Sequence, residues 1–274
     1  FVPFPEPVEG DELRGHPERF AEHYNQATLF YDSQTAWERK HIIDAFAFEL
    51  SKVTVPQIRE RMVASLRNVS DELAQGVADE IGMPLPDPLP RAMPNPPKPE
   101  VAMSPALSLT ARPGDGGVAT RKVAILAAEG VDGKAVSAVA DALIKAGAVV
   151  RLVGQRIGPL QSDDGGALDA DASLDNHPSG LFDGAVVPGG AAAAERLSAD
   201  GRALEFLRDA YRHGKTLMGM GEGARVFEAA GIAPDPDDGG LLLADGAAGK
   251  SAAAFIEALG KHRHPERESA PPKV

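Results

Sequence analysis

The sequence predicts an α/β protein in which a parallel sheet is sandwiched between helices, preceded by a small α-helical segment and a Pro-rich linker. After Arg121, short apolar runs alternate with stretches whose apolar residues recur at helical spacing. Such runs are typical of parallel strands that are covered on both faces. Upstream, helical spacing follows helix-capping motifs, and a stretch rich in proline separates the two regions.

Three short helices are predicted at residues 35–82. Thr35-Ala-Trp-Glu38 reads as a capping box, in which the hydroxyl and the carboxylate each bind a backbone N–H that would otherwise be unpaired. Thr54-Val-Pro-Gln57 repeats this motif, and Ser70 is predicted to cap a third helix that Gly82 ends. A bundle this small buries little surface, so we expect it to dock on another domain.

The segments on either side of these helices are predicted to be irregular. Residues 1–34 show little periodicity and carry four prolines, so we expect a segment that wraps over another part of the protein. Residues 83–118 form a linker with ten prolines. Because Pro-rich chains run extended at about 3.1 Å per residue, this linker is either a spacer or a strap over a neighbouring domain or subunit.

Residues 119–262 are predicted to form the α/β domain. Its strands are the apolar runs at 123–127, 149–153, 183–190, 217–220 and 241–243. Apolar residues at helical spacing predict helices around 136–143, 204–211, 226–230 and 255–259. This alternation predicts a flavodoxin-like parallel sheet. Residues 263–274 are predicted to be a polar, frayed tail.

Composition excludes several classes of function. The net charge of −12 argues against a surface that binds nucleic acid, because such surfaces cluster Lys and Arg. No apolar run approaches the roughly 20 residues that a membrane span needs. The absence of Cys removes disulfides, thiolate nucleophiles and Cys-ligated metals. We therefore expect a cytoplasmic protein with neither a nucleic-acid nor a membrane partner.

The start of the sequence is unusual. It opens with Phe1-Val-Pro-Phe4, has no initiator Met, and its first Met is Met62. The first residues do not show the charged segment followed by an apolar segment that is typical of a secretion signal. We expect a chain that begins in the middle of a longer protein, in preference to one from which a targeting segment has been trimmed.

A strand, a sharp turn and a helix are predicted at Thr216–Gly231. This layout exposes a nucleophile at the top of a parallel sheet in other enzymes. Here the tip of the turn is Gly221, which offers neither a nucleophile nor a base, so covalent catalysis is not expected. We interpret Glu222 as a carboxylate that stabilises a helix N-terminus. Whether the cleft near Gly221 and Glu222, which lacks a nucleophile, binds a ligand stays open.

Two further groups follow predicted strands. Glu129 and Asp132 come directly after the first strand, where open α/β sheets bind ligands, but a general acid there would lack a nucleophilic partner. Gly189-Gly190 could present backbone N–H groups as an oxyanion hole, although a turn is the simpler interpretation.

The remaining candidates have simple structural interpretations. His262 and His264 suggest metal binding but lie in a polar tail without an acidic ligand at useful spacing. Arg208 and Tyr211 suggest a haem-ligating tyrosinate, yet Tyr211 is predicted to pack in a helix stripe. Gln155 to Asp164 contains no phosphate-binding motif. The sequence therefore predicts no catalytic, cofactor-binding or metal-binding residue in this chain.

Two blocks resemble one superfamily. Asp183-Gly-Ala-Val-Val-Pro-Gly-Gly190, with the turn at Gly221, resembles the class I glutamine amidotransferase-like superfamily and its intracellular-protease branch. That branch has Cys at the position of Gly221 and commonly His or Ala at that of Glu222. Its supporting acid follows the first strand, where this chain has Asp132-Gly-Lys134. The resemblance implies a fold but no transferable catalytic residue.

The first half carries a more specific resemblance. His23-Tyr-Asn-Gln-Ala-Thr-Leu-Phe30, Ser33-Gln-Thr35 and His41-Ile-Ile-Asp-Ala-Phe-Ala-Phe-Glu-Leu-Ser-Lys-Val53 resemble the helical region that follows the haem barrel in large-subunit haem catalases. Those catalases continue through an extended linker into a flavodoxin-like C-terminal domain without a nucleophile, and the order here is the same. The resemblance covers nearly the whole chain. It implies haem in the parent protein, bound by residues upstream of those present here.

Three hypotheses follow. In the first, the chain is the C-terminal portion of a large-subunit catalase, which disproportionates hydrogen peroxide in oxidative-stress defence. This portion would contact the catalase barrel domain and sister subunits of a homotetramer and stabilise them, without a complete active site. In the second, the chain is a free-standing binding or chaperone-like module with an inactive amidotransferase-like fold. The third is an amidotransferase-like hydrolase, against which Gly221 argues.

Overall fold

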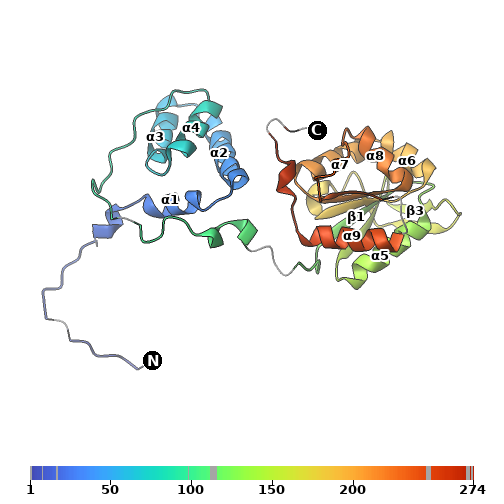
Figure 1. Ribbon diagram of the computed structural model, residues 1–274, viewed down its shortest axis with the longest axis horizontal. Helices are drawn as coiled ribbons and strands as arrows, with labels where there is room; N and C mark the ends of the chain where they lie inside the picture. Colours follow the sequence, from blue (N-terminus) through green and yellow to red (C-terminus); the bar gives the residue numbers. More distant parts are fainter. Residues whose placement is uncertain are drawn as a thin grey trace. The chain divides into compact units, whose positions relative to one another are not determined.

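The computed structural model describes every residue except 1, 8, 17, 98, 112–115, 245–247, 270, 271 and 273. The chain divides into a helical unit, Phe1–Arg112, and an α/β unit, Pro113–Val274 (Figure 1). Each unit has its own hydrophobic core. Parts of the predicted linker and tail, including Pro113 and Gly114, lie outside the described residues. In the described part of the chain, no helix combines the length and the apolarity that crossing a membrane requires.

Among the residues that the structure describes, four α-helices build the helical unit. Their bounds are α1 (Asn25–Asp32), α2 (Ala36–Ser51), α3 (Pro56–Leu66) and α4 (Asp71–Glu80). Helix α4 packs against both α2 and α3. The core of this unit is apolar and includes Tyr31, Ile43, Leu50, Val63, Leu66, Leu73 and Val77.

The structure confirms two of the three predicted helix caps and contradicts the third. The capping box at Thr35 and Glu38 is confirmed, and the Ser70 hydroxyl accepts a hydrogen bond from the Leu73 N–H. The predicted box at Thr54 is wrong, because α3 begins at Pro56 with Val55 as its N-cap. A residue before proline is driven out of the helical region of backbone space, and Val55 is extended at φ −92°, ψ 109°. The helix therefore starts one residue later than the motif requires.

Helix α1 corrects the prediction that residues 1–34 are irregular throughout. The Glu22 carboxylate caps this helix by accepting hydrogen bonds from the N–H groups of Tyr24 (3.1 Å) and Asn25 (2.8 Å). Of its eight residues only Tyr31 is fully buried, so the apolar pattern is too short to show a period. Helices this short are marginal alone, and packing of Tyr31 into the core of the helical unit stabilises this one.

The described part of the Pro-rich segment is fastened to the helical unit. The buried carboxylate of Glu38 accepts hydrogen bonds from the Ser108 hydroxyl and the Leu109 N–H, each at 2.8 Å. The Asn68 amide donates to the Leu89 carbonyl at 2.8 Å. Burial alone would raise the pKa of Glu38, but hydrogen bonds from Thr35, Leu109 and Ser108 lower it. This segment is therefore a strap on its own unit rather than a free spacer.

A six-stranded parallel sheet forms the centre of the α/β unit (Figure 1). Its order is β5-β2-β1-β6-β7-β8, and every neighbouring pair is parallel. The bounds are β1 (Lys122–Ala127), β2 (Val149–Gly154), β5 (Ala172–Ser173), β6 (Gly184–Val187), β7 (Thr216–Met220) and β8 (Leu241–Ala244). Without the short β5, this is the 2-1-3-4-5 order of flavodoxin-like folds, so the predicted fold class is confirmed.

Helices cover both faces of the sheet. Helices α5 and α9 pack together on one face, while α6, α7 and α8 pack together on the other (Figure 1). Their bounds are α5 (Gly133–Lys145), α6 (Ala191–Ser198), α7 (Gly201–Arg212), α8 (Ala224–Ala229) and α9 (Ala248–Gly260). The strands between them are almost entirely apolar, as expected for a sheet buried on both sides.

The sequence did not predict α6 or a small antiparallel hairpin. The hairpin consists of β3 (Gly158–Gln161) and β4 (Ala167–Ala170), which follow β2. In β3 only Leu160 is buried, so the strand lacks both the apolar run and the alternation that predict strands.

Candidate functional site

The turn after β7 keeps the shape of a nucleophile elbow. Gly221 has φ +50°, and η5 (Gly221–Gly223) connects the strand directly to α8. A Cβ atom on Gly223 would lie 2.3 Å from the Val187 carbonyl oxygen, so only glycine fits there. A Cβ atom on Gly221 would meet nothing nearer than the Gly189 Cα at 4.0 Å. The elbow therefore has room for a side chain at its tip, but glycine supplies no reacting atom.

Glu222 uses its carboxylate as a backbone ligand. Its Oε2 accepts a hydrogen bond from the Gly190 N–H at 3.2 Å. This N–H is the group that the sequence suggested as an oxyanion donor. Hydrogen bonds from its own N–H and from that of Gly190 lower the pKa of Glu222 below its ordinary value. In this arrangement a negative charge lies where an oxyanion would have to bind.

The other carboxylates at the carboxyl edge of the sheet also bind backbone groups. Asp132 is the N-cap of α5, and its Oδ1 accepts from the N–H groups of Lys134 (3.0 Å) and Ala135 (2.9 Å). Glu129 accepts from the Gln161 N–H at 2.8 Å and so holds the β3–β4 hairpin against the end of β1. These contacts are structural, because one carboxylate caps a helix and the other fixes the hairpin.

The hairpin also encloses a groove. Its volume is about 950 Å³, and its lining includes Glu129, Pro159, Ser162 and Arg196. The hydroxyl of the lining residue Ser162 donates to Asp164 at 2.6 Å, and this bond lowers the pKa of the Asp164 carboxyl. The stretch Gln155 to Asp164 therefore contains β3 and the start of the turn that leads to β4.

At the opposite edge of the sheet, two polar residues of the C-terminal segment, His264 and Arg267, are buried. Asp238 precedes β8, and its Oδ2 accepts from Arg267 Nε at 2.7 Å, with the two side chains only 3% and 1% exposed. The Arg267 guanidinium also stacks over the Tyr211 ring, 4.7 Å from the centroid, and donates to the Lys215 carbonyl. The prediction of a frayed tail is thus wrong for this segment. Arg267 can be buried because Asp238, distant in sequence, neutralises its charge.

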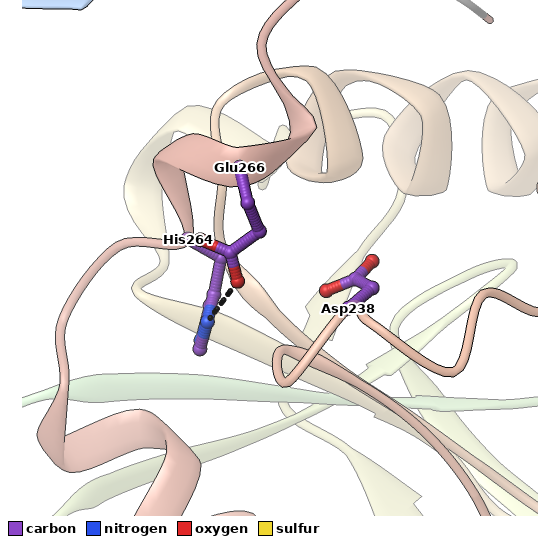
Figure 2. A group of neighbouring side chains, drawn as sticks. All are labelled: Asp238, His264 and Glu266. Atoms are coloured by element: carbon purple, nitrogen blue, oxygen red, sulfur yellow. Dashed lines mark ion pairs between the residues drawn. The ribbon is translucent and has the colours of Figure 1, made fainter.

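His264 joins the same network. Its side chain is 2% exposed, its Nε2 lies 3.0 Å from the Thr216 hydroxyl, and its Nδ1 lies 3.4 Å from Glu266 Oε1 (Figure 2). Burial lowers the pKa of His264, and the positive charge of Arg267 lowers it further. The interpretation of His264 as a solvated tail residue is therefore wrong, whereas His262 is about half exposed.

Asp238, His264 and Glu266 place potential metal ligands within 4.8 Å of one another (Figure 2). The donor set nevertheless fits a cation poorly. Both oxygens of Asp238 already accept hydrogen bonds, one from Arg267 and the other from the Gly240 N–H. A divalent ion would also face the positive charge of the Arg267 guanidinium. The geometry supports a structural network rather than a metal site.

The residues that suggested a haem ligand do not fit haem. The Tyr211 ring is buried beneath Arg267, and Arg208 Nε donates to the Ala230 carbonyl at 2.8 Å. The two side chains thus bind other parts of the α/β unit. A tyrosinate ligand needs a deprotonated hydroxyl, but burial raises the pKa of Tyr211, which opposes ionisation.

Two family models cover most of the chain. Residues 17–81 match the model described as catalase-related immune-responsive. Residues 119–269, more than half of the chain, match the model of the C-terminal domain found in long catalases. The chain belongs to the long-catalase family. The resemblance to large-subunit catalases drawn from the helical motifs is confirmed.

Long catalases from several bacteria are similar to this chain. Catalase HPII of Pseudomonas aeruginosa is 38% identical over 273 residues, and Catalase C of Rhizobium meliloti is 39% identical over 272. Catalase-2 of Bacillus subtilis is 31% identical over 269 residues. These alignments cover 98%, 96% and 97% of this chain, respectively. The chain spans about 37% of the length of each of these relatives.

Proposed function

We infer that this chain acts within a long catalase as a structural and assembly region, and that haem and peroxide chemistry belong to another part of that protein. The observation that carries this proposal is the elbow, where Gly221 replaces the reacting side chain and Glu222 blocks the nearby N–H donor. The names of the relatives support hydrogen peroxide disproportionation as the activity of the parent protein and haem as its cofactor.

The helical unit supplies a surface for the proposed assembly. Large apolar side chains of α2, of α3 and of the loop between them are exposed, among them Phe48, Val55, Ile58 and Met62. Exposed apolar side chains that gather in one region are typical of interaction sites. We propose that the partners are the haem-bearing barrel domain and sister subunits of a homotetramer. The strap and the segment at 1–34 would wrap over the same assembly, and the absence of Cys supports a cytoplasmic location.

Deletion of residues 119–269 from the parent catalase tests this proposal. We expect the truncated enzyme to keep its Soret absorbance and its activity per haem, because no reacting group is removed. Its half-life at elevated temperature should fall by about tenfold, and its oligomers should dissociate more readily. A truncated enzyme that stays folded and oligomeric but loses haem or activity would contradict the assignment of a structural role.

A further inference from the structure

The groove beside the β3–β4 hairpin lies where the strand order of the sheet reverses. From β1 the chain continues to β2 on one side, whereas β6 lies on the other side of β1 and leads on to β7 and β8. Open α/β sheets bind ligands at such a reversal, in the crevice outside the carboxyl ends of the strands. The lining of the groove comes from residues that follow β1, from the hairpin that follows β2, and from α6, which follows β6. The groove therefore occupies the position at which ligands bind in this class of fold.

Both walls of the groove are fixed to the residues that follow β1. On the hairpin side, the Gly130 N–H donates to the Gln161 carbonyl, and the Gln161 N–H donates to Glu129 Oε2, each at 2.8 Å. On the side of α6, a Cβ atom on Gly130 would lie 2.8 Å from the Ala192 Cβ, and one on Gly190 would lie 2.3 Å from the Gly130 carbonyl oxygen. Because these contacts hold the walls in place, the groove is formed before a ligand arrives, which lowers the cost of ordering it on binding.

Apolar side chains supply much of the lining. Pro159, Leu160 and Ala167 belong to the hairpin, and Ala191 and Ala192 belong to α6. Sites for small molecules are typically lined in this way, with a few polar groups that fix the orientation of the ligand, and have volumes of roughly 300–1,000 Å³. The volume of this groove, about 950 Å³, lies within that range. The groove can therefore cover the apolar part of a small ligand from two sides.

Two charged residues of opposite sign that line the groove have no partner in the described part of the chain. Arg196 lies on α6, and Asp163 lies in the turn between β3 and β4. Both side chains are exposed, and neither forms a hydrogen bond or an ion pair with a described residue. The third charged lining residue, Glu129, is engaged, because Oε2 accepts from the hairpin backbone and Oε1 lies 4.0 Å from Arg156 Nη2. A free cation thus lies on the helix wall and a free carboxylate on the hairpin wall.

We propose that this groove binds a small zwitterion with an apolar body, a free amino acid or a short peptide. The ligand carboxylate pairs with Arg196, because a planar guanidinium donates to two oxygens at once. The ligand ammonium pairs with Asp163, and the apolar body lies against the hairpin and α6. A simple anion or cation would satisfy one wall and gain nothing from the other. This inference is independent of the proposed role in a catalase, because it rests on the α/β unit alone.

Heteronuclear NMR of the full, ¹⁵N-labelled chain tests this site, with leucine and the dipeptide alanyl-leucine as probes. We expect saturable shifts of the amide signals of Gly130, Gln161 and Ala192, which line the groove. N-acetylation of alanyl-leucine removes the ammonium, and C-terminal amidation removes the carboxylate. Each change should weaken binding by about tenfold, because one charge-assisted hydrogen bond is lost. Equal affinities for leucine and alanyl-leucine identify an amino-acid site, and tighter binding of the dipeptide identifies a peptide site.

Substitutions of the two charged residues assign each end of the ligand. Arg196→Gln should weaken the binding of alanyl-leucine by about tenfold but leave that of its amide unchanged, because the amide lacks the group that Arg196 binds. Asp163→Asn should weaken alanyl-leucine by a similar factor and leave the N-acetylated peptide unchanged. Both variants should unfold at the Tm of the unsubstituted chain, because neither side chain has a partner in the described part of the fold.

Glu195→Gln and Arg225→Gln are the matched controls. Both residues are exposed, neither lines the groove, and both variants should bind alanyl-leucine as the unsubstituted chain does. Absence of saturable shifts at the groove would overturn the proposal, as would equal affinities for the free and the capped peptides. Unchanged binding in both Arg196→Gln and Asp163→Asn would also contradict it. Shifts confined to the elbow at Gly221 would place the ligand outside the groove and would have the same consequence.

Discussion

The two edges of the parallel sheet treat charged side chains differently. At the carboxyl edge, Asp132 and Glu222 are partly or fully exposed, and each carboxylate binds backbone N–H groups. At the amino edge, Asp238 and Arg267 are almost completely buried and bind each other. Open α/β sheets usually bind ligands at the carboxyl edge. In this chain we expect the charged pair that is most costly to disrupt to lie at the other edge.

The two edges differ because the charged groups at one edge contact solvent and those at the other do not. An exposed carboxylate that loses one hydrogen bond regains it from water, so its removal costs little. A buried ion left without its partner cannot be solvated, and the free energy of unfolding falls by several kcal/mol. Substitutions at the two edges should therefore differ in effect although the residue types are similar.

The largest effect is expected for Asp238→Asn. This change leaves the Arg267 guanidinium buried without its counter-charge, which should lower the free energy of unfolding of the α/β unit by about 3–5 kcal/mol. Denaturant unfolding of the full chain measures it. Asp175→Asn is the matched control, because Asp175 pairs with Arg202 at 2.6 Å on the surface and should cost less than about 1 kcal/mol. Equal losses in the two variants would refute the contrast between the edges.

The next effect is a pH dependence at the amino edge. The pKa of His264 is lowered in the folded state, so the unfolded chain binds a proton first as the pH falls. Stability contributed by neutral His264 is complete above about pH 6.5 and is lost as the pH falls through the lowered folded pKa. The loss should be smaller than for Asp238→Asn, because Glu266 lies near Nδ1.

Thermal unfolding as a function of pH measures this dependence. His264→Asn should flatten the stability curve below about pH 6.5. The pKa of His262 is also lowered by burial, so His262→Gln, measured in parallel, separates the two contributions. An unchanged curve in His264→Asn would show that the buried imidazole does not control acid stability.

At the carboxyl edge, Gly221→Ala should have a modest effect. The methyl group meets open space, so the cost is the left-handed backbone, about 1–2 kcal/mol. Equilibrium unfolding gives this value, and the crystal structure of the variant should show an unshifted elbow. A loss above about 4 kcal/mol would mean that the tip of the elbow is packed rather than vacant.

The smallest effect is expected for Glu222→Gln. The side chain is exposed, and an amide oxygen can still accept from the Gly190 N–H, so the free energy of unfolding should change by less than about 0.5 kcal/mol. The same denaturant titration measures it. A loss comparable to that of Asp238→Asn would place a major electrostatic contribution at the elbow and remove the distinction between the edges.

Much of this fold could be predicted from local sequence patterns. The strands at the centre of the sheet, β1, β6 and β7, are almost continuous apolar runs. Thr35 and Ser70 cap helices through contacts with residues no more than three positions away. The absence of a nucleophile at Gly221 could also be seen directly in the sequence. Each of these features depends on neighbours along the chain.

Features that depend on distant partners were not predictable in the same way. His264 and Arg267 look like a solvated tail because the partner that allows their burial, Asp238, lies on another loop. The β3–β4 hairpin lacks an apolar pattern, and Glu129 holds it from outside. The sequence did carry one indication of the charged side chains at the amino edge. Ionisable residues stand just before several strands, on the side of the sheet where ligands seldom bind.

Haem titration of the purified chain tests the central claim most directly, namely that these residues carry no redox centre. Absorbance in the Soret region, followed at increasing haem, should show only the weak, unsaturable change of non-specific association, and oxygen evolution from hydrogen peroxide should equal that of free haem. A sharp one-to-one endpoint with a shifted Soret band, lost on substitution of a Tyr or His of this chain, would contradict the account.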